Sequence, residues 1–199
     1  MRILIVGASG TIGKRISDEL SKKHDVISGG RTNADVEVDI TSAISIEDMY
    51  HSVGKVDAVI CAAGPAKFGP FGEMTEEDMY VGIHGKMMGQ VNLVRIGQNY
   101  LNDSGSFTLT TGILADEPVA GSVGLSLVNG AVNSFAIAAA QELPRGLRVN
   151  VVCPTVVEDS AEMYADFFPG FDAAPMSKVV NAYIRCLMTK INGRIIHVY

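Results

Sequence analysis

The sequence predicts an α/β fold, in which one doubly wound parallel sheet of about seven strands carries helices on both faces within a single domain, residues 1–199. Three observations lead to this prediction. Short apolar runs rich in β-branched residues alternate with segments whose apolar residues recur at helical spacing. The first such run leads directly into a glycine-rich turn and a helix. No repeat, low-complexity tract or linker interrupts the alternation, so one domain accounts for the chain.

The first unit is the most informative. Arg2–Val6 is an unbroken apolar run of the kind found in fully buried parallel strands. It ends at Gly7-Ala8-Ser9-Gly10-Thr11-Ile12-Gly13, after which Ile12, Ile16 and Leu20 follow at helical spacing. In such a turn Gly7 permits the tight bend, Gly10 the approach of a pyrophosphate, and Gly13 close packing of the helix on the strand. The free N–H groups of the helix would face the phosphates, so this stretch predicts a dinucleotide site.

The next elements complete the first half of the sheet. Strands are expected over Asp25–Ser28, Val36–Val38 and Asp57–Ile60, each in an apolar run bounded by turn residues. Between the last two strands, Ser45-Ile46-Glu47-Asp48 has the pattern of a helix start with a capping box.

The second half begins with a helix at Thr75, where three carboxylates occupy the first turn, and this helix is expected to run to about Tyr100. Phe107–Thr110 is the predicted fifth strand, and Gly121–Leu143 is a long helix closed by Pro144.

Leu147–Val152 and Arg194–Val198 are the last two expected strands, and a helix starting at Pro175 lies between them. Residues 156–174 are expected to form a small substrate or lid segment, because Asp159–Asp172 is aromatic and has a short helical pattern of its own.

The composition argues against several classes of function for this chain. Hydrophobic residues make up 47% and charged residues 19% of the chain, which is a globular composition. The net charge of −6 without a basic stripe argues against nucleic acid as a partner, and no apolar run is long enough for a membrane span. Without a charged leader at the N-terminus, we expect a cytoplasmic protein. The three cysteines, Cys61, Cys153 and Cys186, form no Cys-x-x-Cys pair and are expected to be reduced core residues.

Several of these stretches together resemble the short-chain dehydrogenase/reductase superfamily, over nearly the whole chain. The turn from Gly7 to Gly13 is similar to the family's glycine motif, with the spacing of its atypical and extended branches. Asp39-Ile40 stands where the family holds the adenine ring, and Cys61-Ala62-Ala63-Gly64 keeps the last two residues of an Asn-Asn-Ala-Gly signature. The stretch Asn150 to Thr155 looks like the family's Asn-x-x-x-Pro-Gly run beside the nicotinamide, with Thr155 in place of glycine.

The resemblance implies a Rossmann-like fold and a nicotinamide cofactor site. The residues that it assigns to the cofactor are Gly7, Ser9, Gly10, Thr11, Ile12, Gly13, Arg31, Asp39, Ile40, Ala62, Ala63, Gly64, Pro154 and Thr155. Arg31 follows the second strand, where NAD-preferring proteins place an acidic residue, and a guanidinium there suits the 2′-phosphate of NADP. Asp35 is a rival ligand for the ribose, so NADP is expected ahead of NAD.

The catalytic half of the family pattern is missing. The family transfers a hydride between nicotinamide and a carbonyl or alcohol, using a tyrosine, a lysine four residues later, a serine and an asparagine. Alignment of the long helix puts the tyrosine position at Leu125 and the lysine position at Asn129. The serine position falls on Gly112, beside Thr111, and the asparagine position on Gly82. Neither leucine nor asparagine can act as the acid or base that this chemistry needs.

Two residues are candidates for the missing roles. Lys86 lies one helical turn after Gly82, and a desolvated lysine could act as an acid or orient a substrate oxygen; the alternative is a solvent-exposed lysine. Thr111 ends the fifth strand together with Thr110, at the edge where ligands bind in open α/β sheets, and could hold a carbonyl oxygen as serine does. His84 is expected to face another way. No histidine shows metal-ligand spacing with a cysteine or carboxylate, so no metal site is expected.

Gly82, Gly85 and Gly89 recur along one face of a helix at a cost of about 1 kcal/mol each relative to alanine. This cost indicates that the sheet, a ligand or a partner helix approaches closely. Small residues on the long helix (Gly130, Ser134 and Ala138) complement them, and the resemblance implies a homodimer or homotetramer that pairs these two helices.

The first hypothesis is therefore an NADP-dependent oxidoreductase that acts on a small carbonyl or alcohol through a non-standard active site containing Thr111 and Lys86. An alternative of a different class is a catalytically silent module that senses NADP(H) or serves as an interaction subunit, which Leu125 and Asn129 favour. A third is a non-redox isomerase or lyase that keeps the cofactor bound.

Overall fold

A computed structural model describes all 199 residues and confirms the predicted fold class. Seven strands form one sheet in the order β3-β2-β1-β4-β5-β6-β7, and every neighbouring pair is parallel. The strands are β1 (Arg2–Val6), β2 (Asp25–Gly30), β3 (Val36–Glu37), β4 (Val56–Cys61), β5 (Leu101–Thr110), β6 (Arg148–Pro154) and β7 (Ile195–Val198).

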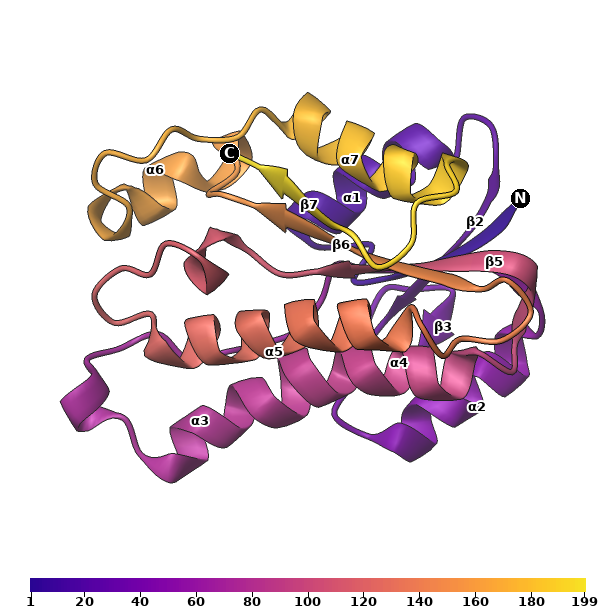
Figure 1. Cartoon of the computed structure of the whole chain (residues 1–199), viewed down its shortest axis with the longest axis horizontal. Helices are drawn as coiled ribbons and strands as arrows, with labels where there is room; N and C mark the ends of the chain where they lie inside the picture. Colours follow the sequence, from indigo (N-terminus) through magenta and orange to yellow (C-terminus); the bar gives the residue numbers. More distant parts are fainter.

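Helices cover both faces of the sheet (Figure 1). They are α1 (Thr11–Leu20), α2 (Ala43–Val53), α3 (Glu76–Gly82), α4 (Gly89–Gly97), α5 (Val123–Ala139), α6 (Ala161–Tyr164) and α7 (Met176–Met188), with a π-helical turn at Ile83–Met88 joining α3 to α4. One hydrophobic core lies between the sheet and α2, α4 and α5, and a second lies between the sheet and α1 and α7. None of the helices combines the length and the apolar character that a membrane crossing requires.

Several predicted boundaries differ from the observed ones. β5 was expected from Phe107 but begins at Leu101, because the fully buried Leu101 pairs with Val56 beyond an irregularity in the ladder. The side chain of Ser42, not that of Ser45, caps α2 by accepting a hydrogen bond from the Ser45 N–H. α5 ends at Ala139, before the expected Leu143. The capping box at Thr75 is confirmed.

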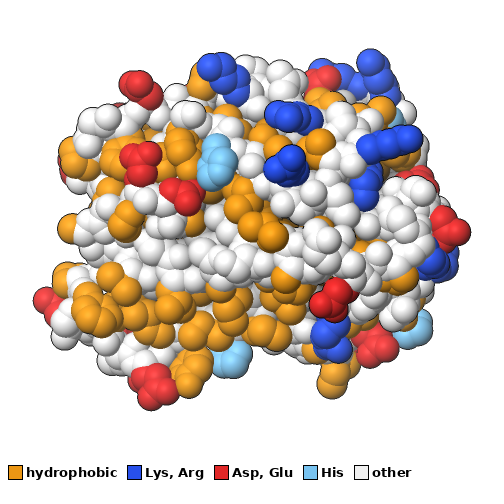
Figure 2. All heavy atoms as spheres, in the orientation of Figure 1, with side chains coloured by type: hydrophobic (Ala, Val, Ile, Leu, Met, Phe, Trp, Pro, Cys, Tyr) orange, Lys and Arg blue, Asp and Glu red, His pale blue; other side chains and the backbone are white.

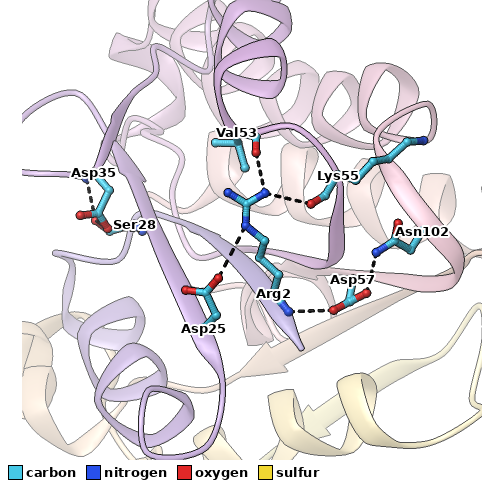
Figure 3. A network of polar contacts seen from close by, with 8 residues as sticks. All are labelled: Arg2, Asp25, Ser28, Asp35, Val53, Lys55, Asp57 and Asn102. Carbon is cyan, nitrogen blue, oxygen red and sulfur yellow. Dashed lines mark hydrogen bonds and ion pairs between the residues drawn. The ribbon is translucent and has the colours of Figure 1, made fainter.

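A polar network holds the amino-terminal edge of the sheet, far from the strand ends where ligands bind (Figure 3). The Asp57 carboxylate accepts hydrogen bonds of 2.7 Å from the backbone N–H of Arg2 and from the side-chain amide of Asn102. These bonds lower the pKa of Asp57, the one from Asn102 contributing most. The Arg2 guanidinium donates to the carbonyl of Val53 at 2.7 Å. β1, β4 and the start of β5 are thereby joined at one end.

The glycines of the α3–α4 segment pack within the chain. A Cβ on Gly85 would lie 2.7 Å from the ring of Pro65, and one on Gly89 would lie 3.0 Å from the carbonyl oxygen of Ile40. A Cβ on Gly82 would lie 3.1 Å from Val128, a residue of α5. Internal neighbours therefore account for all three glycines, and no partner helix is needed to explain them.

The outer side of α5 and α3 is apolar instead. Figure 2 shows hydrophobic side chains gathered over this part of the molecule. Leu127 and Ile137 of α5 are 50% and 49% exposed, and Tyr80 of α3 is 43% exposed. This surface, rather than the glycine face, is where an association with another chain would bury apolar area.

Candidate functional site

A cavity of about 900 Å³ opens at the carboxyl edge of the sheet. It is bounded by the residues that follow four strands, among them Thr11 after β1, Gly64 after β4, Thr111 after β5 and Thr155 after β6. Apolar side chains form much of its wall, and Lys86 is the one Lys, Arg, His, Asp or Glu among the lining residues. Ligands of open α/β sheets bind at this edge, so the cavity is the candidate site.

The glycine turn has the expected geometry. Gly7 has φ of 88°, and its N–H donates to the carbonyl of Gly29 at 2.8 Å. A Cβ on Gly13 would lie 2.0 Å from the carbonyl oxygen of Gly7, so only glycine lets α1 pack this closely. Gly10 is the N-cap of α1 and no side chain caps the helix, which leaves its first N–H groups free for an anion.

Two buried polar atoms in the cavity wall have no partner within the protein. Asn129 is 2% exposed and Thr155 is 5% exposed, and both residues line the cavity. Neither the side-chain oxygen of Asn129 nor the hydroxyl of Thr155 makes a hydrogen bond. Because an unpartnered buried polar atom costs about 1–3 kcal/mol, this pair fits a ligand that brings its own hydrogen-bonding groups, as a nicotinamide riboside does.

Lys86 enters the cavity from the π-helical turn, a distortion often found at functional sites. Burial lowers the pKa of its ammonium to about 8, although the thiols of Cys61 and Cys153 act in the opposite direction. No carboxylate forms a salt bridge with it. Gly64, with φ of 136°, is needed for this placement, because a Cβ there would lie 2.7 Å from the Cα of Lys86.

Gln90 supports Lys86 and was not anticipated from the sequence. Its fully buried amide accepts from the N–H of Thr110 at 2.8 Å and donates to the carbonyl of Thr110 at 3.0 Å. It also donates to the carbonyl of Lys86 at 3.2 Å. One side chain therefore ties the lysine turn to the end of β5. A polar residue inside a helix whose neighbours are mostly buried was the signal that could have identified it.

The structure brings three of the four aligned catalytic positions together. Gly112, Leu125 and Asn129 all line the cavity, and a Cβ on Gly112 would be in ordinary contact, 3.6 Å, with the side-chain nitrogen of Asn129. The fourth expectation, that Gly82 faces the site, is wrong: Gly82 packs against Val128 and Ala66, and Lys86 is the residue of this helix that reaches the cavity.

Thr111 lines the cavity, but its hydroxyl is engaged elsewhere. It donates to the side-chain oxygen of Asn133 on α5 at 2.9 Å, and Thr111 is 4% exposed. In this arrangement it cannot also donate to a substrate oxygen, which argues against the serine-like role expected for it. Thr110 faces the core instead, where its hydroxyl lies 2.6 Å from that of Tyr183. His84 is exposed, stacks on Tyr80 and does not line the cavity, as expected.

The remaining cofactor candidates follow β1, β2, β3 and β4 and do not line the cavity. Arg31 directly follows β2, is exposed, and has no hydrogen bond or salt bridge. The rival Asp35 is occupied, because its carboxylate accepts from both the N–H and the hydroxyl of Ser28, which lowers the pKa of Asp35. Asp39 accepts from the N–H and hydroxyl of Thr41 and so shapes its own turn. Ser9, Ile40, Ala62 and Ala63 also lie outside the cavity wall.

The segment 156–174 contributes aromatic side chains to the wall of the cavity. Phe167 packs edge-to-face on Phe68, with ring centroids 4.7 Å apart, and so joins this segment to the loop after β4. Tyr164, Phe167 and Phe168 line the cavity. These contacts favour a ligand with an apolar portion.

The fold also assembles a group that sequence spacing did not indicate. Potential metal-ligating atoms of Asp116, Cys153 and His197 lie within 4.8 Å of one another beside the ends of β6 and β7. The sequence predicts no metal site because His197 has no metal-ligand spacing with a cysteine or carboxylate, whereas in the fold one of each lies close to it. The three residues are far apart in sequence, so only the parallel strand order brings them together.

Comparisons with known proteins agree with this description. A family model described as enoyl-(acyl carrier protein) reductase matches residues 6–186. The chain is 46% identical to the protein lin1944 from Listeria innocua, over 100% of both chains and with a TM-score of 0.98. No protein with a curated function matches the sequence.

Two further solved structures share the fold. A small-chain dehydrogenase crystallised in complex with NADPH is 24% identical, with a TM-score of 0.86 over 100% of this chain and 96% of its own. A short chain dehydrogenase from Burkholderia cenocepacia in complex with NADP is 18% identical, with a TM-score of 0.86 over 99% of this chain and 95% of its own.

Proposed function

The chain belongs to the short-chain dehydrogenase/reductase superfamily, and on this basis we propose that it is an NADP-dependent oxidoreductase acting on a small carbonyl compound or its alcohol. One observation carries the proposal. Lys86, a lysine without a counter-ion, lies in the same cavity as the unpartnered polar atoms of Asn129 and Thr155. A cofactor would satisfy the two polar atoms, and the lysine would handle the substrate oxygen.

Several residues would hold the cofactor. The free N–H groups at the start of α1 suit the pyrophosphate, and Thr11 and Ile12 continue from there into the cavity. Arg31 suits a 2′-phosphate because it is exposed and unpaired while Asp35 is occupied by Ser28. NADPH and NADP are present in two structures of the same fold, which supports this class of cofactor.

When bound, NADPH supplies a hydride to a carbonyl carbon. Lys86 contributes the proton: its ammonium donates to the carbonyl oxygen as the alcohol forms and is left as a neutral amine. In the reverse direction the amine accepts the proton of the alcohol. A lysine of pKa about 8 exchanges a proton near neutral pH more readily than an ordinary lysine, whose pKa is 10.5. Thr111 supports the wall through Asn133, and the aromatic side chains of residues 156–174 would contact an apolar portion of the substrate.

A second candidate function is a silent NADP(H) sensor or interaction subunit. Gly112, Leu125 and Asn129 favour it, because none of these cavity residues can transfer a proton. We also propose that the exposed apolar side of α5, with Leu127 and Ile137, pairs with a second copy of the chain in a homodimer or homotetramer.

The test follows NADPH oxidation with a panel of small aldehydes and ketones, some aromatic, and NADPH binding by thermal shift. Turnover of at least one carbonyl supports the enzyme. Binding without turnover of any panel member would support the sensor. We expect NADPH to raise the melting temperature well above the value that NADH gives. Arg31→Ala should reduce this difference, whereas the matched change Arg194→Ala should not. Ligand at 100 times its Kd stabilises by about 2.7 kcal/mol, which is readily measured.

A further inference from the structure

Asp116, Cys153 and His197 converge on one point, although they come from three segments of the chain. Asp116 follows the 3-10 turn after β5, Cys153 lies in β6 and His197 in β7. Their potential ligand atoms all lie within 4.8 Å of one another, and the carboxylate oxygen of Asp116 is 3.7 Å from Nδ1 of His197. In a tetrahedral site, two ligands at about 2.0 Å from the metal are roughly 3.3 Å apart, so this pair is close to a coordinating geometry.

The donor set selects the kind of ion. A thiolate, an imidazole and a carboxylate suit Zn²⁺, whereas Mg²⁺ and Ca²⁺ take oxygen ligands almost exclusively. The thiol of Cys153 comes from a fully buried strand position, which makes it a rigid ligand. Asp116 and His197 have side chains 46% and 45% exposed, so an ion can reach them from solvent.

Tyr199 occupies the middle of the group. Its hydroxyl donates to Asp116 at 2.8 Å and lies 2.5 Å from Nδ1 of His197, and its ring packs edge-to-face on that imidazole. The phenol oxygen thus takes the place that an ion would take and keeps the ligands close together. Tyr199 also borders a second cavity of about 530 Å³, which gives the side chain room to move aside and would leave the fourth coordination position facing solvent.

We propose that Asp116, Cys153 and His197 form a Zn²⁺ site with one open position, which Tyr199 fills when no ion is bound. His197 lines the second cavity, and Thr155 lines both this cavity and the candidate site. The proposed Zn²⁺ ligands therefore lie near the candidate site, but none of them lines it. The proposal does not depend on catalytic turnover or on cofactor binding.

Co²⁺ is the probe, because its optical spectrum reports the ligands. Titration of the wild type should produce the near-ultraviolet band of thiolate-to-cobalt charge transfer and the strong visible bands of a four-coordinate ion, and Zn²⁺ should displace both. Cys153→Ser should abolish the charge-transfer band. The matched variant Cys186→Ser, which changes another fully buried and free cysteine, should leave it unchanged.

The other variants test the remaining ligands. His197→Gln and Asp116→Asn should each weaken Zn²⁺ binding by more than the roughly 10–100-fold that the loss of an outer-shell partner costs. Tyr199→Phe should retain or tighten binding, because it removes the competing hydroxyl. The proposal would be overturned if the wild type showed no charge-transfer band or if Cys153→Ser kept it. The side chains of Asp116, His197 and Tyr199 would then form a hydrogen-bonded group without a metal. If Tyr199→Phe lost Zn²⁺ binding, Tyr199 would be a ligand, and the proposal that the fourth coordination position is open would be overturned. Circular dichroism of each variant in the absence of metal confirms that it is folded.

Discussion

Replacing Lys86 by methionine separates the catalytic role of this side chain from its structural role. Methionine keeps an unbranched apolar chain in the cavity but can neither donate nor accept a proton. Removing a positioned acid lowers a rate by about 10²–10⁴-fold, equivalent to about 2.7–5.4 kcal/mol of barrier. The kcat of carbonyl reduction should fall by this amount, while the Kd for NADPH should stay near its wild-type value. Lys190→Met, which changes an exposed lysine outside the cavity, is the matched control.

The same substitution should raise stability. Burial lowers the pKa of Lys86 from 10.5 to about 8, so the folded state holds its proton less tightly than the unfolded state does. The ammonium therefore costs the folded protein up to about 3 kcal/mol below pH 8, and this cost disappears as the pH rises through 10. Lys86→Met should increase the urea midpoint at pH 7. An inactive variant that is more stable than wild type cannot owe its inactivity to misfolding.

The pH profile gives the sharpest form of this prediction. Because the proton donor is the ammonium, the wild-type kcat for reduction should fall roughly tenfold between pH 7 and pH 9, with a midpoint near 8. Lys86→Arg keeps its charge throughout this range, so the midpoint near 8 should vanish from its profile. A wild-type rate that does not change with pH across this range, or a Lys86→Met variant as active as wild type, would refute the assignment.

Three further predictions concern other parts of the molecule. In the Lys86→Met background, Leu125→Tyr combined with Asn129→Lys should restore NADPH-dependent carbonyl reduction by about 10²–10⁴-fold, because it supplies a new proton donor, whereas Leu125→Phe with Asn129→Gln should not. No gain from the first pair would count against the cavity as a reduction site. Leu127→Glu should shift the sedimenting species toward the monomer, and a wild type that is already monomeric at micromolar concentration would contradict the proposed association. Asp57→Asn should lower the free energy of unfolding at pH 7 by about 1–2 kcal/mol. Because the pKa of Asp57 is lowered in the folded state, this difference should shrink as the pH falls below about 4. A difference that stays constant with pH would show that the charge of Asp57 is not responsible.

The strand–glycine–helix unit could be predicted because each residue acts locally. A Cβ on Gly13 would meet the backbone of Gly7 and Ala8 within the same turn, and Gly7 has the positive φ of a tight bend, so spacing alone identified their roles. Alignment also placed Leu125 and Asn129 on one helix face, and both line the cavity. Regular periodicity was sufficient wherever the backbone followed an ideal helix or strand.

The sequence could not reveal features that depend on irregular backbone or distant contacts. In an ideal helix Gly82 and Lys86 would lie on the same face, and so both were expected at the site. The π-helical turn changes this spacing, and only Lys86 lines the cavity. The direction of the Thr111 hydroxyl depends on Asn133 from α5. The group of Asp116, Cys153 and His197 exists only because β5, β6 and β7 are neighbours in the sheet.

The proposed active site requires that one cavity brings the cofactor and Lys86 together, and a crystal structure with bound NADP⁺ and a small alcohol or ketone inhibitor would show whether it does. We expect the nicotinamide riboside to occupy the cavity, the side-chain oxygen of Asn129 and the hydroxyl of Thr155 to gain hydrogen bonds from it, and Nζ of Lys86 to lie within hydrogen-bonding distance of the inhibitor oxygen. A cofactor bound outside the cavity, or a Lys86 amine out of reach of that oxygen, would contradict this arrangement.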